Sequence, residues 1–223
     1  MVAGMTTEPF VHLFVPGTRA GAHTLLLLHG TGGDENDLLP LGRMLDPAAA
    51  MLSVRGKVLE NGMPRFFRRI AEGVFDLDDL RARTDELAMF LPEAAAEHGF
   101  DAAALVAVGY SNGANIAASL LLQSGAPLAG AILLRCMVPY EPGPGASRAG
   151  TRVLVCQGRM DPIIPAEHGQ RVAELLQARG AEVTLHVEDA GHGLERGDIE
   201  TARAWLSDPG APGGSRGPGS ARS

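Results

Sequence analysis

The chain has 223 residues, of which 45% are hydrophobic, and a formal net charge of −7 at neutral pH. This length predicts one domain with a sizeable core, and the composition is that of an ordinary soluble globule. Because the net charge is negative and the body has no basic cluster, nucleic-acid binding through phosphate contacts is disfavoured. No apolar run approaches 18 residues, so we expect no membrane span.

The two cysteines, Cys136 and Cys156, are too few for a disulfide framework and fit a reducing compartment. We expect Cys136 to be a buried, inert thiol at a strand end. The first 25 residues lack a basic segment followed by an apolar stretch, which predicts no signal peptide and a cytoplasmic location. Residues 1–8 are expected to form an extension, residues 9–206 one domain, and residues 207–223 a disordered tail rich in Gly, Pro, Ser and Arg.

Predicted strands and helices alternate along the chain. Apolar or alternating runs predict strands at residues 10–15, 24–28, 50–54, 105–108, 129–134, 152–156 and 182–188. Helical spacing predicts helices at residues 36–45, 80–98, 165–179 and 198–205, and one directly after Ser111. The segment 55–75 is expected to be irregular and to act as a partial lid at most. The fold class is therefore α/β: a doubly wound, mostly parallel sheet of about seven strands, with helices on both faces and no large cap domain.

The sharpest motif is the pentapeptide GYSNG at residues 109–113, which lies between a predicted strand and a predicted helix. Gly109 and Gly113 leave room for a tight turn that lifts the Ser111 hydroxyl clear of the sheet. The same G-x-S-x-G pattern recurs around Ser215, but no strand precedes it and no helix follows it. We therefore take Ser111 as the candidate nucleophile and the pattern at Ser215 as coincidence.

A nucleophilic serine needs a base, and three histidines follow Ser111 in the chain. His192 lies between two glycines just past the last predicted strand, where a loop can bring the imidazole close. His168 falls inside a helical pattern, and His186 points away from the apolar face of its strand. We predict His192 as the base and structural roles for the other two.

The base needs an acid that orients it, and in this topology the acid follows a strand between the serine and the histidine. Asp161 comes a few residues after the predicted strand 152–156. The alternative is Asp189, three residues before His192, but a carboxylate on the histidine's own loop is poorly placed to hold the ring from behind. We favour Asp161 as the acid and expect Asp189 to brace the loop.

A tetrahedral intermediate needs amide donors for its oxyanion. One predicted donor is the N–H of Asn112, at the positive end of the helix that follows the nucleophile. The second is expected in the turn HGTGG at residues 29–33, where Thr31 is favoured and Gly32 comes next. His29 is expected to have a structural role in this turn.

Four stretches together carry a resemblance: LLLLHGTGGDENDLLPL, GYSNGANIA, GRMDPIIP and GHGLE. They resemble the α/β-hydrolase superfamily and, within it, the phospholipase/carboxylesterase family of acyl-protein thioesterases and bacterial carboxylesterases. The stretch VRGKVLENGMPRFF, followed by FDLDDL, is similar to the bacterial branch that includes the methylhydroquinone-induced hydrolases. Over residues 10–206 the resemblance implies a serine esterase without metal or cofactor, with Ser111, Asp161 and His192 as its triad.

Two positions depart from the acyl-protein thioesterases, which usually have Gln at Asn112 and Leu at Thr31. Both are predicted to act through backbone amides, so the oxyanion hole is expected to survive, whereas specificity for long acyl chains does not carry over. Without a long cap, the pocket is expected to be shallow and open, which favours small or aryl carboxylic esters. The candidate substrate-binding residues are Gly32, Phe66, Phe67, Phe75, Met137, Ile163 and Ile164.

Several questions stay open at this point. Glu60 and Arg65 are expected to pair and hold the segment 55–75, although they could instead meet a polar substrate. An acyl thioesterase or a lysophospholipase would use the same triad as a carboxylesterase. A catalytically silent binding protein on the same fold is a further alternative. Similar proteins form homodimers, but no sequence signal establishes one.

Overall fold

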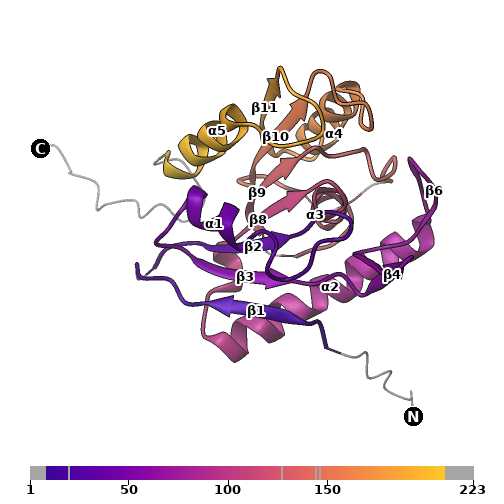
Figure 1. The fold of residues 1–223 in the computed structure, drawn as a ribbon. Helices are drawn as coiled ribbons and strands as arrows, with labels where there is room; N and C mark the ends of the chain where they lie inside the picture. Colours follow the sequence, from indigo (N-terminus) through magenta and orange to yellow (C-terminus); the bar gives the residue numbers. More distant parts are fainter. Residues whose placement is uncertain (1–8, 20, 127, 144, 146, 209–223) are drawn as a thin grey trace, which may run out of the picture.

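A seven-stranded sheet forms the centre of the computed structural model, which describes residues 9–208 except 20, 127, 144 and 146 (Figure 1). In spatial order the strands are β1 (His12–Val15), β3 (Ala50–Val54), β2 (Thr24–Leu28), β8 (Leu105–Tyr110), β9 (Leu128–Leu134), β10 (Arg152–Gly158) and β11 (Glu182–Glu188). Strand β1 runs antiparallel to β3, and the other neighbours in this sheet are parallel. The expected extension at residues 1–8 and the tail at 209–223, with Ser215, lie outside the described residues.

Helices cover both faces of the sheet, as predicted. They are α1 (Leu39–Leu45), α2 (Leu77–His98), α3 (Asn112–Gln123), α4 (Glu167–Gln177) and α5 (Arg196–Ser207), with a short 3₁₀ turn at Ala102–Ala104. On β2, Leu26 and Leu28 face the core under α2, α3 and α4, whereas Leu25 and Leu27 face the core under α1 and α5. The run of leucines in β2 therefore reflects a strand that is buried on both faces. None of the described helices is long and apolar enough to span a membrane.

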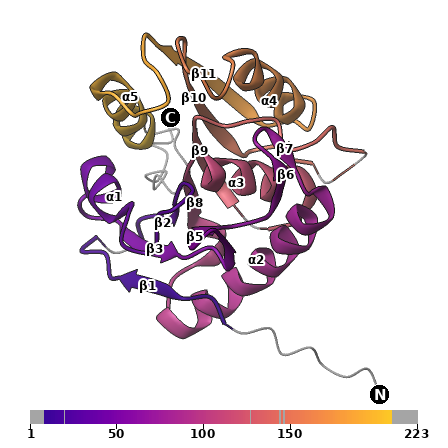
Figure 2. The ribbon, with the colours of Figure 1, turned by 45° about the vertical axis from the view of Figure 1, so that its right-hand side comes forward.

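The segment 55–75 is ordered into two small hairpins, so the expectation of an irregular segment is wrong. Strand β4 (Val58–Glu60) pairs with β5 (Met63–Arg65), and β6 (Arg69–Ala71) pairs with β7 (Val74–Phe75). Asn61 and Gly62 connect β4 to β5 with φ angles of 53° and 80°. Positive φ at both loop residues is typical of a tight hairpin turn. Figure 2 shows β6 and β7 beside the start of α2.

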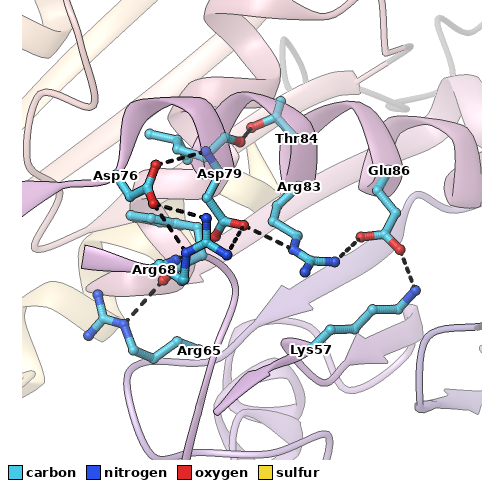
Figure 3. Close-up of polar contacts among 10 residues, drawn as sticks. Lys57, Arg65, Arg68, Asp76, Asp79, Arg83, Thr84 and Glu86 are labelled. Carbon is cyan, nitrogen blue, oxygen red and sulfur yellow. Dashed lines mark hydrogen bonds and ion pairs between the residues drawn. The ribbon is translucent and has the colours of Figure 1, made fainter. Parts of the chain in front are cut away.

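Charged side chains attach this hairpin segment to α2 (Figure 3). Lys57 Nζ lies 2.6 Å from Glu86 Oε1, and Arg68 Nη2 lies 3.0 Å from Asp76 Oδ2. The Arg68 backbone amide donates to Asp79 Oδ2 at 2.7 Å. Asp76 also caps α2, because its carboxylate accepts the backbone N–H of Asp79 at 3.1 Å. These charged side chains thus cap the N-terminus of α2 and hold the hairpin segment against the helix.

Candidate active site

Ser111 lies on a sharp turn between β8 and α3. Its backbone has φ 52° and ψ −111°, a conformation that non-glycine residues rarely adopt. The flanking glycines are required by close packing: a Cβ on Gly113 would come within 1.9 Å of the Leu28 carbonyl oxygen, and one on Gly109 within 2.5 Å of the Gly113 carbonyl oxygen. The Ser111 amide donates to the Leu134 carbonyl at 2.9 Å, which fixes the strained turn against β9.

The structure brings the three predicted residues into one hydrogen-bonded row. His192 Nε2 lies 3.1 Å from Ser111 Oγ, and His192 Nδ1 lies 2.8 Å from Asp161 Oδ2. The three side chains follow β8, β10 and β11, so they meet at the carboxyl edge of the parallel strands. The Asp161 side chain is 0% exposed and that of His192 is 20% exposed. The carboxylate is therefore shielded, while the imidazole stays within reach of solvent.

Asp161 is held as an ionised acceptor. Its Oδ1 accepts the backbone N–H groups of Ile163 at 2.8 Å and Ile164 at 3.0 Å. Burial alone would raise the pKa of Asp161, but the hydrogen bonds from His192 and the two amides lower it on balance. The rival carboxylate, Asp189, instead pairs with Arg159 at 2.6 Å on the surface.

The other histidines after Ser111 make structural contacts, as expected. His168 Nδ1 accepts the amide of Val138 at 3.2 Å, and His186 Nε2 lies 3.1 Å from Glu188 Oε2. His29, before the serine, accepts the amide of Gly56 through Nε2 at 2.9 Å. Among these histidines, His192 is therefore the one whose side chain contacts the hydroxyl of Ser111.

Backbone amides at two turns face the same strand edge as Ser111. The N–H groups in the first turn of a helix have no partner within it, and Asn112 is the first residue of α3. In the turn after β2, the Gly32 amide donates to the Pro64 carbonyl at 2.9 Å, whereas the Thr31 amide has no acceptor among the described residues. Gly32 thus uses its amide to hold the first hairpin, and the roles of the Asn112 and Thr31 amides as oxyanion donors stay predictions.

The first hairpin also fixes the side chains at both turns. Arg65 Nη1 donates to Thr31 Oγ1 at 2.7 Å, and the Phe66 amide donates to Asn112 Oδ1 at 2.7 Å. Arg65 is also ion-paired with Glu60, with Nε 3.2 Å from Oε2, as expected for a pair that holds the segment. The predicted pair is therefore present, and its arginine contacts the turn that carries Thr31.

The predicted wall residues differ in how far they are open to solvent. Ile163 is 49% exposed and Met137 is half-buried. The aromatic rings are packed instead: Phe66 lies 4.8 Å from the His29 ring, and Phe67 lies 5.0 Å from the Phe75 ring, between centroids. Ile164 is buried as well. Substrate contact by the exposed members has the more direct structural support, and for the whole set it stays a prediction.

Two further observations concern residues near this edge. Cys136 is fully buried, and burial raises the pKa of its thiol, so it fits the expected inert role. Arg135, to which we assigned no role from the sequence, donates to the carbonyls of Gly191 and Gly193 on either side of His192. The signal in the sequence that could have pointed to Arg135 is its position as a charged residue directly after a buried apolar strand.

A hydroxyl, an imidazole and a carboxylate in this order are the groups that acyl transfer requires. Comparison with known proteins agrees with that chemistry, because a family model described as Phospholipase/Carboxylesterase matches residues 78–208. The chain belongs to the phospholipase/carboxylesterase family. Membership confirms the resemblance seen in the sequence and makes the chain a hydrolase of the esterase type.

Individual similar proteins support the same conclusion. The hydrolase MhqD of Bacillus subtilis (strain 168) is 48% identical over 197 residues, which cover 88% of this chain and 98% of MhqD. The crystal structure of a Bacillus cereus carboxylesterase is 51% identical, with a TM-score of 0.86 over 88% of this chain and 92% of that one. A Mesorhizobium loti carboxylesterase is 33% identical, with a TM-score of 0.85 over 92% and 98%. These matches confirm the predicted α/β-hydrolase fold.

Proposed function

We propose that the chain is a serine carboxylesterase that hydrolyses small or aryl carboxylic esters through an acyl-enzyme on Ser111. The observation that carries this proposal is the row of hydrogen bonds from Asp161 through His192 to Ser111, with the serine on a strained turn. A role for each residue follows from its contacts.

In the acylation step, His192 Nε2 accepts the hydroxyl proton of Ser111 as Oγ attacks the ester carbonyl carbon. The carbonyl oxygen becomes an oxyanion, for which the amides of Asn112 and Thr31 serve as donors. His192 then gives the proton to the leaving alkoxide oxygen as the carbon–oxygen bond breaks. The products of this step are an alcohol and the acyl ester of Ser111.

In the deacylation step, His192 accepts a proton from water, whose oxygen attacks the acyl carbon. Collapse of the second tetrahedral intermediate returns the proton to Ser111 Oγ and releases the carboxylic acid. Asp161 stays ionised throughout, because its pKa is lowered, and it holds the proton of His192 on Nδ1. Nε2 is thereby left free to accept the serine proton.

The surroundings of Ser111 favour a compact substrate. Between β3 and α2, where the hairpins lie, the described chain carries only two hairpins and no separate cap. Three apolar side chains are exposed near the site: Met63, 40% exposed, lies over Gly32, and Met160 and Ile163 lie on either side of Asp161. An open site with a few apolar side chains at its rim is suited to short acyl or aryl groups.

The test compares matched short-chain aryl oxygen esters and thioesters as substrates of the wild type and of Ser111→Ala. We expect the oxygen ester to give the higher kcat/KM and Ser111→Ala to lower it by on the order of 10⁴- to 10⁶-fold. A thioester preference above about 100-fold, which corresponds to about 2.7 kcal/mol, would contradict a carboxylesterase. Hydrolysis of a lysophospholipid alone would assign the chain to that substrate class.

A fluorophosphonate probe separates an enzyme from a silent binding protein. We expect stoichiometric labelling of the wild type and none of Ser111→Ala. No labelling of the wild type, or equal labelling of both, would favour the binding protein.

A further inference from the structure

Arg135 is a buried charge at the end of β9 that acyl transfer does not itself require. Its side chain is 0% exposed, and its backbone has φ 56°, in the left-handed region that favours glycine. The guanidinium is paired with Asp198 of α5 through both oxygens, at 2.9 Å and 2.6 Å. A strained backbone and a desolvated ion pair both cost free energy, so the surrounding contacts must offset that cost.

The remaining donors of Arg135 reach the loop that carries His192. Nε donates to the Gly191 carbonyl at 3.1 Å, and Nη2 donates to the Gly193 carbonyl at 2.8 Å. The hydroxyl of Tyr110 donates to the carbonyl of His192 itself at 3.1 Å. Three successive carbonyls are therefore held, in a loop whose two glycines would otherwise leave the backbone free to move.

We propose that Arg135 is a positioning residue for His192: Asp198 fixes the guanidinium, and the guanidinium fixes the loop so that the imidazole stays within reach of Ser111. This inference rests on the proposed function, because it concerns the same base. Arg135 contacts neither the nucleophile nor the imidazole directly, so it acts through the loop backbone.

The end of β9 also holds the nucleophile, so serine and histidine share one support. The Leu134 carbonyl accepts the amide of Ser111 at 2.9 Å, and the Arg135 amide donates to the Cys156 carbonyl of β10 at 2.8 Å. Two consecutive residues thus contact the serine turn, the histidine loop and the strand that precedes Asp161. Their position fixes the distance over which the proton moves.

The ion pair with Asp198 also neutralises the charge of Arg135 beside the loop that carries His192. Burial alone would lower the pKa of Arg135, but its hydrogen bonds and ion pair with Asp198 raise it on balance, so the guanidinium stays charged. Asp198 in turn lies close to His186 and Glu188 of β11, with nitrogen and oxygen atoms of the three side chains within 4.8 Å of one another. Removing the charge of Asp198 leaves the guanidinium without its carboxylate partner, so its hold on the loop that carries His192 weakens.

The first arm of the test compares Arg135→Lys with Arg148→Lys, a matched control. Arg148 is also buried, at 6% exposed, and it donates to the backbone carbonyls of Leu120, Leu121, Ser124 and Ala126, away from the site. We expect both variants to lower Tm. Only Arg135→Lys should lower kcat, by about 10- to 100-fold per active site titrated with fluorophosphonate, with KM within about twofold.

The second arm measures kcat and KM for Asp198→Asn, which keeps the shape of the side chain but only one of the two oxygens that accept from Arg135. We expect kcat per titrated active site to fall by about 10-fold with KM within about twofold, because the guanidinium is no longer fixed and the loop that carries His192 loosens. A role limited to stability would lower Tm and leave kcat per active site unchanged.

Equal kcat values for Arg135→Lys and Arg148→Lys would overturn the inference, as would an unchanged kcat per active site in Asp198→Asn. Either result leaves the proposed function intact if the wild type still hydrolyses the esters. Failure of the proposed function would instead appear as a wild type that neither hydrolyses an ester nor reacts with the probe. If Arg135→Lys does not fold, Asp198→Asn still decides between positioning and stability alone.

Discussion

Replacing Gly113 with alanine tests whether close packing against β2 sets the position of Ser111. A Cβ at this position would lie 1.9 Å from the Leu28 carbonyl oxygen, 2.4 Å from the Leu28 carbonyl carbon and 2.6 Å from the His29 carbonyl oxygen. All three neighbours are backbone atoms, and real Cβ atoms essentially never approach closer than 3.0 Å. The first turn of α3 must therefore move away from β2 by more than about 1 Å.

Two consequences follow from this displacement. Overpacking against backbone should cost about 3 kcal/mol of the free energy of unfolding, measured by urea denaturation. A shift of about 1 Å in the Ser111 turn should lower kcat/KM on a short aryl ester by about 100-fold, because the serine no longer lines up with His192. The matched control is Gly125→Ala, since Gly125 lies just past α3 and its Cβ would have nothing within 4 Å.

The result that would refute this reasoning is a Gly113→Ala variant with the stability and kcat/KM of Gly125→Ala. Such a result would mean that α3 can move without displacing the serine, or that β2 yields at little cost. Loss of activity with unchanged stability would separate the two effects and place the strain in the turn alone.

Three further predictions concern ionisable side chains. Asp161→Asn should lower kcat/KM by on the order of 10⁴-fold at neutral pH, with little change in KM, because the amide no longer keeps the proton of His192 on Nδ1. Glu86→Gln should lower the free energy of unfolding by about 1 kcal/mol at pH 7. Burial alone would raise the pKa of Glu86, but hydrogen bonds from two basic side chains lower it on balance. Urea titrations should therefore show the stabilising contribution of Glu86 above about pH 4. This contribution should be lost as the pH falls through the lowered pKa. Burial raises the pKa of both Cys136 and Cys156, the latter to about 12, so mass spectrometry should find iodoacetamide adducts at pH 8 only after denaturation.

The sheet and the candidate site could be predicted because their signals are local. The leucines of β2 form a continuous apolar run, as expected for a strand covered on both faces. Asp161 and His192 each follow a strand in a parallel sheet, so their chain positions alone place them at one edge. The turn at residues 109–113 was recognisable because a strand and a helix flank it.

The parts that escaped prediction depend on short elements or distant contacts. Strands of two or three residues, such as β7 and β4, have no measurable period, although the Asn61–Gly62 pair was a turn signal. The contact between Arg135 and Asp198 joins residues 63 apart, and no local pattern specifies it. Hydrophobicity likewise cannot tell whether Phe66 lines a pocket or packs in the core.

The ion pairs between the hairpins and α2 imply that ionic strength acts unequally on the molecule. Mobile ions screen partly exposed charges such as Arg68 and Asp76 at a range of about 8 Å in physiological salt, whereas the buried ion pair of Arg135 and Asp198 is protected. Added salt therefore loosens the segment that contacts Thr31 and Asn112 before it affects the serine and histidine. A salt titration should accordingly change KM at concentrations where kcat is still constant.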